Sequence, residues 1–163
     1  MKPVIHVDDV PLEAHTHGDR FATRDGSVGE HIGARLLGCS VTAVPPGKRA
    51  YPFHCHHVNE ELFVILDGTG VLRHGANEHP VRAGSVIATP PGGPETAHQL
   101  INTGDVDLRY LAISTMIAGD VVEYPDSGKV AVYVGSAPGG DRSKRTFTYR
   151  GRLTAPADYW DGE

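Results

Sequence analysis

Hydrophobic positions along this chain come in short runs of strand length, separated by turns rich in glycine, proline, aspartate and asparagine. The clearest run covers residues 61–66. Asp67 and Gly68 then give a strong hairpin signal, and residues 71–74 return from the turn. Similar runs predict further strands at residues 35–44, 79–82, 85–89, 98–102, 106–116, 121–124 and 129–134. No apolar stripe with a helical period extends beyond about two turns. The pattern therefore predicts an all-β chain of the jelly-roll or barrel kind.

The run at residues 61–66 is apolar on both faces of its predicted strand. Alternation places every second residue on the face of Glu61 and leaves three apolar residues on the other face: Leu62, Val64 and Leu66. A strand with one face in water would carry polar residues on that face. We therefore expect the barrel core to cover one face and a second subunit to cover the other, which predicts a homodimer, with covering by a segment of the same chain as the alternative.

Two flanking segments have a different character from the central runs. Residues 1–34 show little periodicity, and we interpret them as an N-terminal arm with a short strand at residues 2–7. Residues 35–135 form the predicted barrel, and residues 136–163 form a C-terminal arm after a glycine-rich linker. That second arm has four aromatic residues, which we expect to pack on the barrel or on a partner subunit: Phe147, Tyr149, Tyr159 and Trp160.

Composition and charge narrow the function classes. The chain has 163 residues and a formal net charge of −5, with no basic run, which argues against nucleic acid or an anionic membrane surface as the partner. Its apolar runs are far shorter than the ~18 residues that a membrane span requires. Two cysteines, Cys39 and Cys55, do not indicate a disulfide framework, and the first residues lack a signal-peptide core. We therefore expect a cytoplasmic protein with a small-molecule ligand or substrate.

Candidate metal ligands gather around the strand at residues 61–66. His54 and His56 are two residues apart, so their side chains share one face of an extended segment. Glu61 has the wrong parity to continue that strand, which indicates that a bend brings the three side chains together. Imidazole and carboxylate ligands suit a mid-series divalent metal. Chance is the alternative, because a second such histidine pair occurs at residues 15–17 without an apolar strand after it.

A second stretch strengthens the metal interpretation. Residues 84–102 supply a strand, a turn of proline and glycine, and a histidine that begins another apolar strand. Together the two stretches resemble the motifs of the cupin superfamily. The first motif corresponds to Gly47, His54, His56, Glu61 and Gly68, and the second to Gly84, Pro90, Gly92, His98 and Asn102. The loops before His54 and before His98 are longer than in the usual pattern.

This resemblance implies a cupin-type double-stranded β-helix that holds one divalent metal ion. The implied ligands are His54, His56, Glu61 and His98, a set that Fe, Mn, Ni, Zn and Cu all tolerate. The implied function is a mononuclear metalloenzyme acting on a small oxygenated molecule by dioxygenase, isomerase or hydrolase chemistry. A non-catalytic binding or sensing module with a metal anchor is the alternative, and a metal-stabilised structural protein is a third possibility.

Three residues near the candidate ligands are expected to line a substrate pocket, and Cys55 is expected to have no role in metal binding. Phe63 and Leu100 have inward parity with Glu61 and His98, so we expect them to line a substrate pocket, with plain core packing as the alternative. Tyr110 is the third expected pocket residue, because it alternates with Arg109 and only one of the two can face inward. Cys55 should point away from the metal and serve as a small hydrophobic residue rather than as a ligand.

Overall fold

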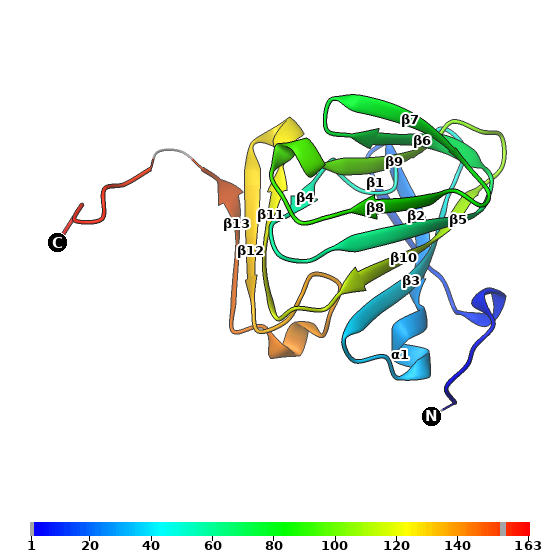
Figure 1. Cartoon of the computed structure of the whole chain (residues 1–163), viewed down its shortest axis with the longest axis horizontal. Coiled ribbons are helices and arrows are strands. Elements are labelled where there is room, and N and C mark those ends of the chain that lie inside the picture. Colours follow the sequence, from blue (N-terminus) through cyan, green and yellow to red (C-terminus); the bar gives the residue numbers. More distant parts are fainter. Residues whose placement is uncertain (1, 154–155) are drawn as a thin grey trace.

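The computed structural model describes residues 2–153 and 156–163, and within these residues the strands form three sheets (Figure 1). The largest sheet runs in the order β1 (Glu13–His17), β2 (Phe21–Ser27), β3 (Leu37–Val44), β10 (Leu108–Thr115), β5 (Glu61–Asp67) and β8 (Val86–Thr89). The second runs β13 (Phe147–Arg152), β12 (Lys129–Val134), β11 (Gly119–Tyr124) and β4 (Cys55–His56). The third runs β7 (Asn77–Arg82), β6 (Thr69–His74) and β9 (His98–Asn102).

Within residues 2–153 and 156–163, helical structure is confined to short connections. The helix α1 (Val28–Ile32) joins β2 to β3, with the Ser27 side chain accepting from the backbone N–H of Glu30 at its start. Single 3₁₀ turns occur at Val7–Asp9, Pro94–Thr96, Pro125–Ser127 and Arg142–Lys144. No helix in the described part of the chain is long and apolar enough to cross a membrane. The all-β prediction is confirmed.

The turn predicted at Asp67 and Gly68 joins β5 to β6, but the predicted hairpin does not form, because β5 pairs within the first sheet and β6 within the third. Gly68 has a φ of 81°, and a Cβ atom there would lie 2.4 Å from the backbone oxygen of Asp107. Both the left-handed conformation and the close approach therefore require glycine. Within the first sheet, Glu61 of β5 pairs with Thr89 of β8 and with Ser114 of β10.

The main hydrophobic core lies between the first and third sheets. Phe63 and Ile65 of β5 pack there against Leu100 of β9, and all three are at least nine-tenths buried. On the other face of β5, Leu62, Val64 and Leu66 are half-buried within this chain. The predicted parity of the strand is therefore correct, and the candidate ligand Glu61 lies on its core-facing side.

The N-terminal segment corrects the prediction of a strand at residues 2–7, which form no strand. Instead β1 and β2 pair with each other, and β2 pairs with β3 from Arg24↔Ala43 to Ser27↔Ser40. The sequence signal was weak because all five residues of β1 are exposed, so the strand shows no apolar alternation. Backbone pairing with a neighbour, rather than its own side chains, holds this segment in the sheet.

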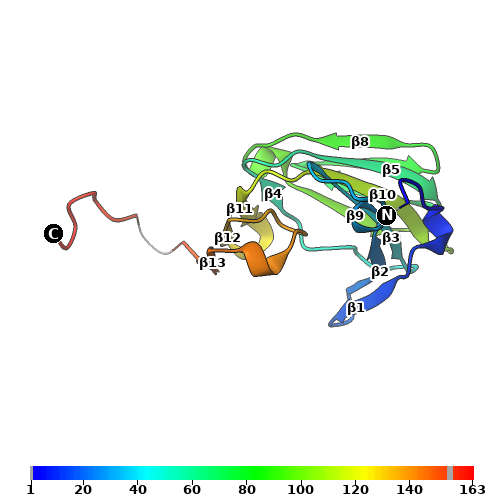
Figure 2. The same ribbon diagram turned by 90° about the horizontal axis from the view of Figure 1, so that it is seen from below.

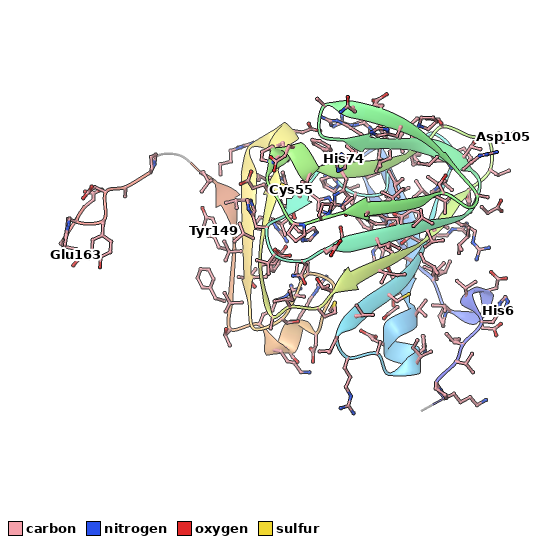
Figure 3. The ribbon with its side chains drawn as sticks, viewed as in Figure 1. His6, Cys55, His74, Asp105, Tyr149 and Glu163 are labelled. Atoms are coloured by element: carbon pink, nitrogen blue, oxygen red, sulfur yellow. The ribbon has the colours of Figure 1, made fainter. Side chains whose placement is uncertain are left out.

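The C-terminal segment also contributes a strand. β13 pairs along its whole length with β12 at the edge of the second sheet (Figure 2). Its aromatic side chains Phe147 and Tyr149 remain exposed, and Tyr149 projects from the outer side of the strand (Figure 3). Tyr159 and Trp160 are exposed as well, in edge contact with each other. The expected packing of the four aromatic side chains does not occur within one chain, and a partner subunit remains a prediction.

Candidate metal centre

The four predicted ligands come from three different sheets. His56 belongs to β4, Glu61 begins β5, and His98 begins β9. His54 precedes β4 and forms an isolated bridge with His98, in which each backbone N–H donates to the other residue's carbonyl at 3.2 and 2.8 Å. That bridge ties the second sheet to the third, so four side chains that are distant in sequence meet at one point.

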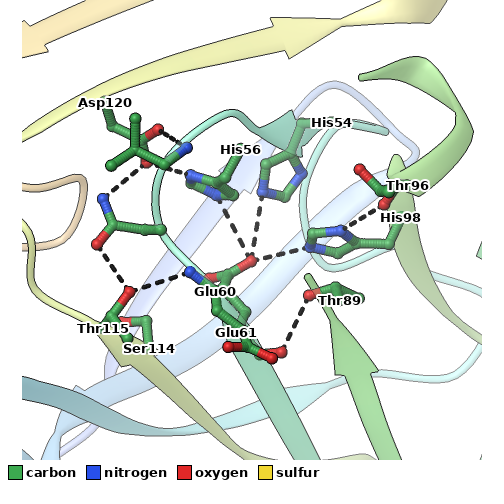
Figure 4. A network of polar contacts seen from close by, with 12 residues as sticks. His54, His56, Glu60, Glu61, Thr89, Thr96, His98, Ser114, Thr115 and Asp120 are labelled. Atoms are coloured by element: carbon green, nitrogen blue, oxygen red, sulfur yellow. Dashed lines mark hydrogen bonds and ion pairs between the residues drawn. The ribbon is translucent and has the colours of Figure 1, made fainter. Parts of the chain in front are cut away.

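Three imidazoles surround a single carboxylate oxygen (Figure 4). The Oε2 atom of Glu61 lies 2.9 Å from Nε2 of His98, 3.5 Å from Nε2 of His56 and 4.0 Å from Nε2 of His54. The ligand atoms of His54, Glu61 and His98 all lie within 4.8 Å of one another. All four side chains are largely buried, since none is more than 18% exposed.

The other ring nitrogen of each histidine has a hydrogen-bond acceptor. Nδ1 of His54 lies 2.8 Å from the Pro52 carbonyl, Nδ1 of His98 lies 3.4 Å from the Thr96 carbonyl, and Nδ1 of His56 lies 2.7 Å from Oδ2 of Asp120. In His98 the shorter contact is the one from Nε2 to Oε2 of Glu61, at 2.9 Å, so Nε2 donates there. A carbonyl only accepts, and an ionised carboxylate does the same, so Nδ1 donates in His54 and His56. In the neutral ring this tautomer leaves the lone pair on Nε2.

The arrangement of these four side chains shows whether they could bind a cation. The Nε2 lone pairs of His54 and His56 face the Glu61 carboxylate, and such electron-rich atoms repel one another unless a proton or a cation lies among them. A divalent cation is attracted to all four atoms, and the Nδ1 contacts are the kind that orient metal-binding histidines. The donor set therefore fits a mid-series divalent metal, and His54, His56, Glu61 and His98 are the residues that would hold it.

The protonation states of His54 and Glu61 suit a metal, whereas His56 holds its proton more strongly. Burial, followed by the nearby His98, lowers the pKa of His54 to about 3, so its ring is neutral at neutral pH. Burial would raise the pKa of Glu61, but the hydrogen bond from His98 and the neighbouring imidazoles lower it to about 2. Burial lowers the pKa of His56, yet the hydrogen bond to Asp120 and the charge of Glu61 outweigh it and raise that pKa.

Sequence reasoning missed Asp120, a buried residue behind His56. Its Oδ1 accepts from the backbone N–H of Val58 at 3.1 Å, and its Oδ2 accepts from Nδ2 of Asn59 at 2.9 Å as well as from His56. The sequence did offer a signal for Asp120: it is an acidic residue directly before an apolar run, as Glu61 is. The predicted strand began at residue 121, whereas β11 begins at Gly119 and includes Asp120.

A cavity of about 560 Å³ opens beside these ligands. The three expected pocket residues, Phe63, Leu100 and Tyr110, all line it, although each also belongs to the main core. The Phe63 ring lies 5.5 Å from the His98 ring and 5.8 Å from the Tyr110 ring, centroid to centroid. Tyr124, which sequence reasoning did not single out, lines the cavity and stacks on His54 at 6.1 Å.

Cys55 points away from the four ligands, as its alternation with His54 and His56 predicts. It is fully buried against Phe53 and Ala97, so it lies in a small core rather than on the surface. Burial raises the pKa of its thiol to about 11, which leaves the thiol protonated at neutral pH.

Comparison with known proteins adds a family match, one relative and two solved structures. The family model described as "Cupin domain" matches residues 40–114. An oxalate-binding protein of Thermotoga maritima is 34% identical over 87 residues, which span 53% of this chain and 67% of that protein. A proposed sugar phosphate isomerase of Acidithiobacillus ferrooxidans has 26% identity and a TM-score of 0.73, covering 80% of this chain and 86% of its own. A sugar phosphate isomerase of Silicibacter pomeroyi has 22% identity and a TM-score of 0.74, covering 94% and 98% respectively, and this likeness concerns the fold alone.

Proposed function

Since the chain belongs to the cupin superfamily, we propose that it is a mononuclear metalloenzyme whose substrate is a small oxygenated molecule. The predicted family and its double-stranded β-helix fold are both confirmed by the matches. The proposal goes further, to one divalent metal ion held by His54, His56, Glu61 and His98. When bound there, the metal would supply Lewis acidity and a template for a chelating substrate.

One observation carries the proposal: three Nε2 atoms converge on the Glu61 carboxylate while each Nδ1 is engaged elsewhere. A buried cluster of this kind is costly for a fold that gains nothing from it, because buried ionisable groups lose their hydration. The adjoining cavity gives a small molecule access to the same point.

The chain's own residues would bind and orient the substrate. Phe63 and Leu100 offer an apolar wall that limits water in the inner cavity, and the Tyr110 ring packs edge-on against Phe63. Burial and the neighbouring phenol of Tyr133 raise the pKa of Tyr124 to about 12, so its hydroxyl stays protonated at the cavity wall.

The relatives support the substrate class. One is described as oxalate-binding and another, at 26% identity, as a proposed sugar phosphate isomerase. Both descriptions concern small molecules with several oxygen atoms and negative charge. We propose the same class for this chain, with isomerase, hydrolase or dioxygenase chemistry still open.

A second candidate is a binding or sensing module that anchors its ligand on the metal without turnover. The description of the Thermotoga maritima relative as oxalate-binding favours it. For either function we propose a cytoplasmic protein that forms a homodimer through the outer face of β5 and the C-terminal aromatic residues.

Elemental analysis of protein purified without a polyhistidine tag tests the metal centre. We expect about one divalent metal per chain, lost in the double variant His54→Ala, His56→Ala. The matched control is His15→Ala, His17→Ala, which removes the other histidine pair and should keep the metal. A His54/His56 double variant that retains full metal content would disprove the proposal.

The metal-loaded protein should then be incubated with oxalate and with sugar phosphates, and the products followed by NMR. Turnover that disappears in the His54/His56 double variant supports the enzyme, whereas saturable binding without turnover supports the binding module. Iron in the purified protein would favour oxygen chemistry, and zinc or nickel would favour isomerisation or hydrolysis.

A further inference from the structure

A second cavity of about 360 Å³ lies beside the first and is lined by three arginines, Arg142, Arg145 and Arg150. Arg142 and Arg145 come from the loop that follows β12, and Arg150 comes from β13. Tyr133 lies between them: Arg150 Nη2 donates to its hydroxyl at 2.8 Å, and the Arg145 guanidinium stacks over its ring at 4.7 Å.

In the part of the chain that the structure describes, none of these three arginines forms an ion pair with a carboxylate. Elsewhere Arg24, Arg73 and Arg109 each pair with an aspartate. The nearest acid in sequence, Asp141, instead accepts from the N–H and hydroxyl of Ser143 and lies near Lys144. Three uncompensated positive charges thus face one cavity in a protein whose net charge is −5.

Contacts with the rest of the chain hold Arg145 and Arg150 in place. Arg145 is half-buried, its Nη2 donates to the Ala137 carbonyl at 3.2 Å, and its Nε is buried without a hydrogen-bond partner. The contacts with Ala137 and Tyr133 hold the Arg145 side chain at the wall of this cavity. The loop is held by Gly135, where a Cβ atom would lie 2.3 Å from the Lys144 carbonyl oxygen.

This second cavity is continuous with the cavity of the metal centre. Tyr133, Pro138, Gly139 and Arg142 line both. At the metal centre, the Tyr124 ring stacks on the His54 ring. Tyr124 also packs against Tyr133 in a small core formed by β11 and β12. A molecule lying against these two tyrosines would have one end near the candidate ligands and the other end near the arginines.

We propose that Arg142, Arg145 and Arg150 form an anion subsite that binds a phosphate group. A carboxylate has two oxygens and is satisfied by one bidentate arginine, whereas a phosphate dianion has enough acceptors for three guanidinium groups. Anion binding here does not depend on the metal. The wider conclusion, that the substrate of the metal centre is a phosphate monoester, rests on the proposed function.

Titration calorimetry with inorganic phosphate tests the subsite, using the full chain both metal-free and metal-loaded. The variant Arg142→Gln, Arg145→Gln, Arg150→Gln should bind phosphate at least about tenfold more weakly than the wild type, because it loses several charge-assisted hydrogen bonds. The matched control, Arg35→Gln, Arg82→Gln, Arg152→Gln, has the same change in charge at exposed arginines outside both cavities and should bind like the wild type. Acetate should bind the wild type more weakly than phosphate does.

Labelling of the wild type with phenylglyoxal gives a readout that does not depend on the folding of a variant. Phosphate should protect Arg142 and Arg150 from modification but should leave Arg35 and Arg82 reactive, as measured by mass spectrometry of peptides. Absence of phosphate binding, equal loss in both triple variants, or equal protection at all four arginines would overturn the proposal.

The His54→Ala, His56→Ala variant separates the two proposals. Phosphate binding that persists in this variant, and in metal-free wild type, belongs to the arginine subsite even if the metal centre proves wrong. Phosphate binding that vanishes with the metal would overturn the subsite and leave the metal centre standing.

Discussion

The change Asp120→Asn tests whether the buried carboxylate behind His56 prepares the metal centre. The aspartate side chain is fully buried and accepts three hydrogen bonds, from His56 Nδ1, the Val58 N–H and Asn59 Nδ2. An asparagine has the same shape but only one accepting oxygen. Whichever way the amide is turned, its NH₂ group faces at least one of these donors.

The less costly orientation turns the NH₂ group toward the Val58 N–H and keeps an oxygen opposite His56 and Asn59. It loses one charge-assisted hydrogen bond, worth about 1.5–3 kcal/mol. For a chain of this length that is a fall of about 3–12 °C in the melting temperature. The opposite orientation lets Nδ1 of His56 accept, which moves the ring proton to Nε2 and blocks the atom that faces Glu61. In either orientation His56 loses the negative charge behind it, which makes it a weaker ligand, so metal affinity is expected to fall about 10–100-fold.

The assay combines thermal unfolding of the metal-free protein with a metal titration against a competing chelator. Glu123→Gln is the matched control, because Glu123 lies on the same strand but contacts the partly exposed His57 at 2.9 Å, outside the metal centre. The control should keep wild-type metal affinity and lose at most about 1 kcal/mol of stability. If Asp120→Asn binds metal as the wild type does and melts at the same temperature, the assigned role of Asp120 is wrong.

Three further predictions concern the same fold. Glu61→Gln should lower metal affinity at least about tenfold while unfolding stays cooperative, because the ligand set loses its only negative charge; unchanged affinity would exclude Glu61 as a ligand. Metal at about 100 times its dissociation constant should add about 2.7 kcal/mol of stability. Because Asp120 and Glu61 raise the pKa of His56, this ring gains a proton as the pH falls and metal must displace it. The melting difference between metal-bound and metal-free protein should thus shrink from about pH 7.5 to about pH 5, and a constant difference would contradict histidine ligation. Light scattering should report twice the chain mass, and a monomer at micromolar concentration would exclude the homodimer.

The sign of that pH effect follows from the folded-state pKa of His56. A raised histidine pKa stabilises the metal-free fold fully below the unfolded value of about 6.5, and this contribution is lost as the pH rises through the folded pKa. Acid therefore favours the metal-free fold at this residue while it weakens metal binding. His54 behaves oppositely, because its pKa of about 3 makes its contribution present above about pH 6.5 and lost toward acid.

The central strands were predictable because each has a local signal. In β5 the apolar residues specify the strand and the Asp67–Gly68 turn specifies its end, whereas β6 pairs in the third sheet rather than in the predicted hairpin. The candidate ligands were accessible for the same reason, since His54, His56 and Glu61 lie close together in the chain. β1 and β13 were missed because their residues are mostly exposed, so pairing with β2 and β12 defines them rather than their own pattern.

What the sequence determined by itself was thus the class of fold, the parity of the buried strands and the residues able to bind a metal. Only the tertiary structure decided which side chains hydrogen-bond to the candidate metal ligands. Asp120 is 64 positions from His56, and no local rule relates the two until β11 pairs with β4. The three arginines likewise gather only because β13 pairs with β12 beside Tyr133. Hydrophobic alternation acts over a few residues, whereas hydrogen bonds and charge clusters form between segments that the folded chain has already brought together.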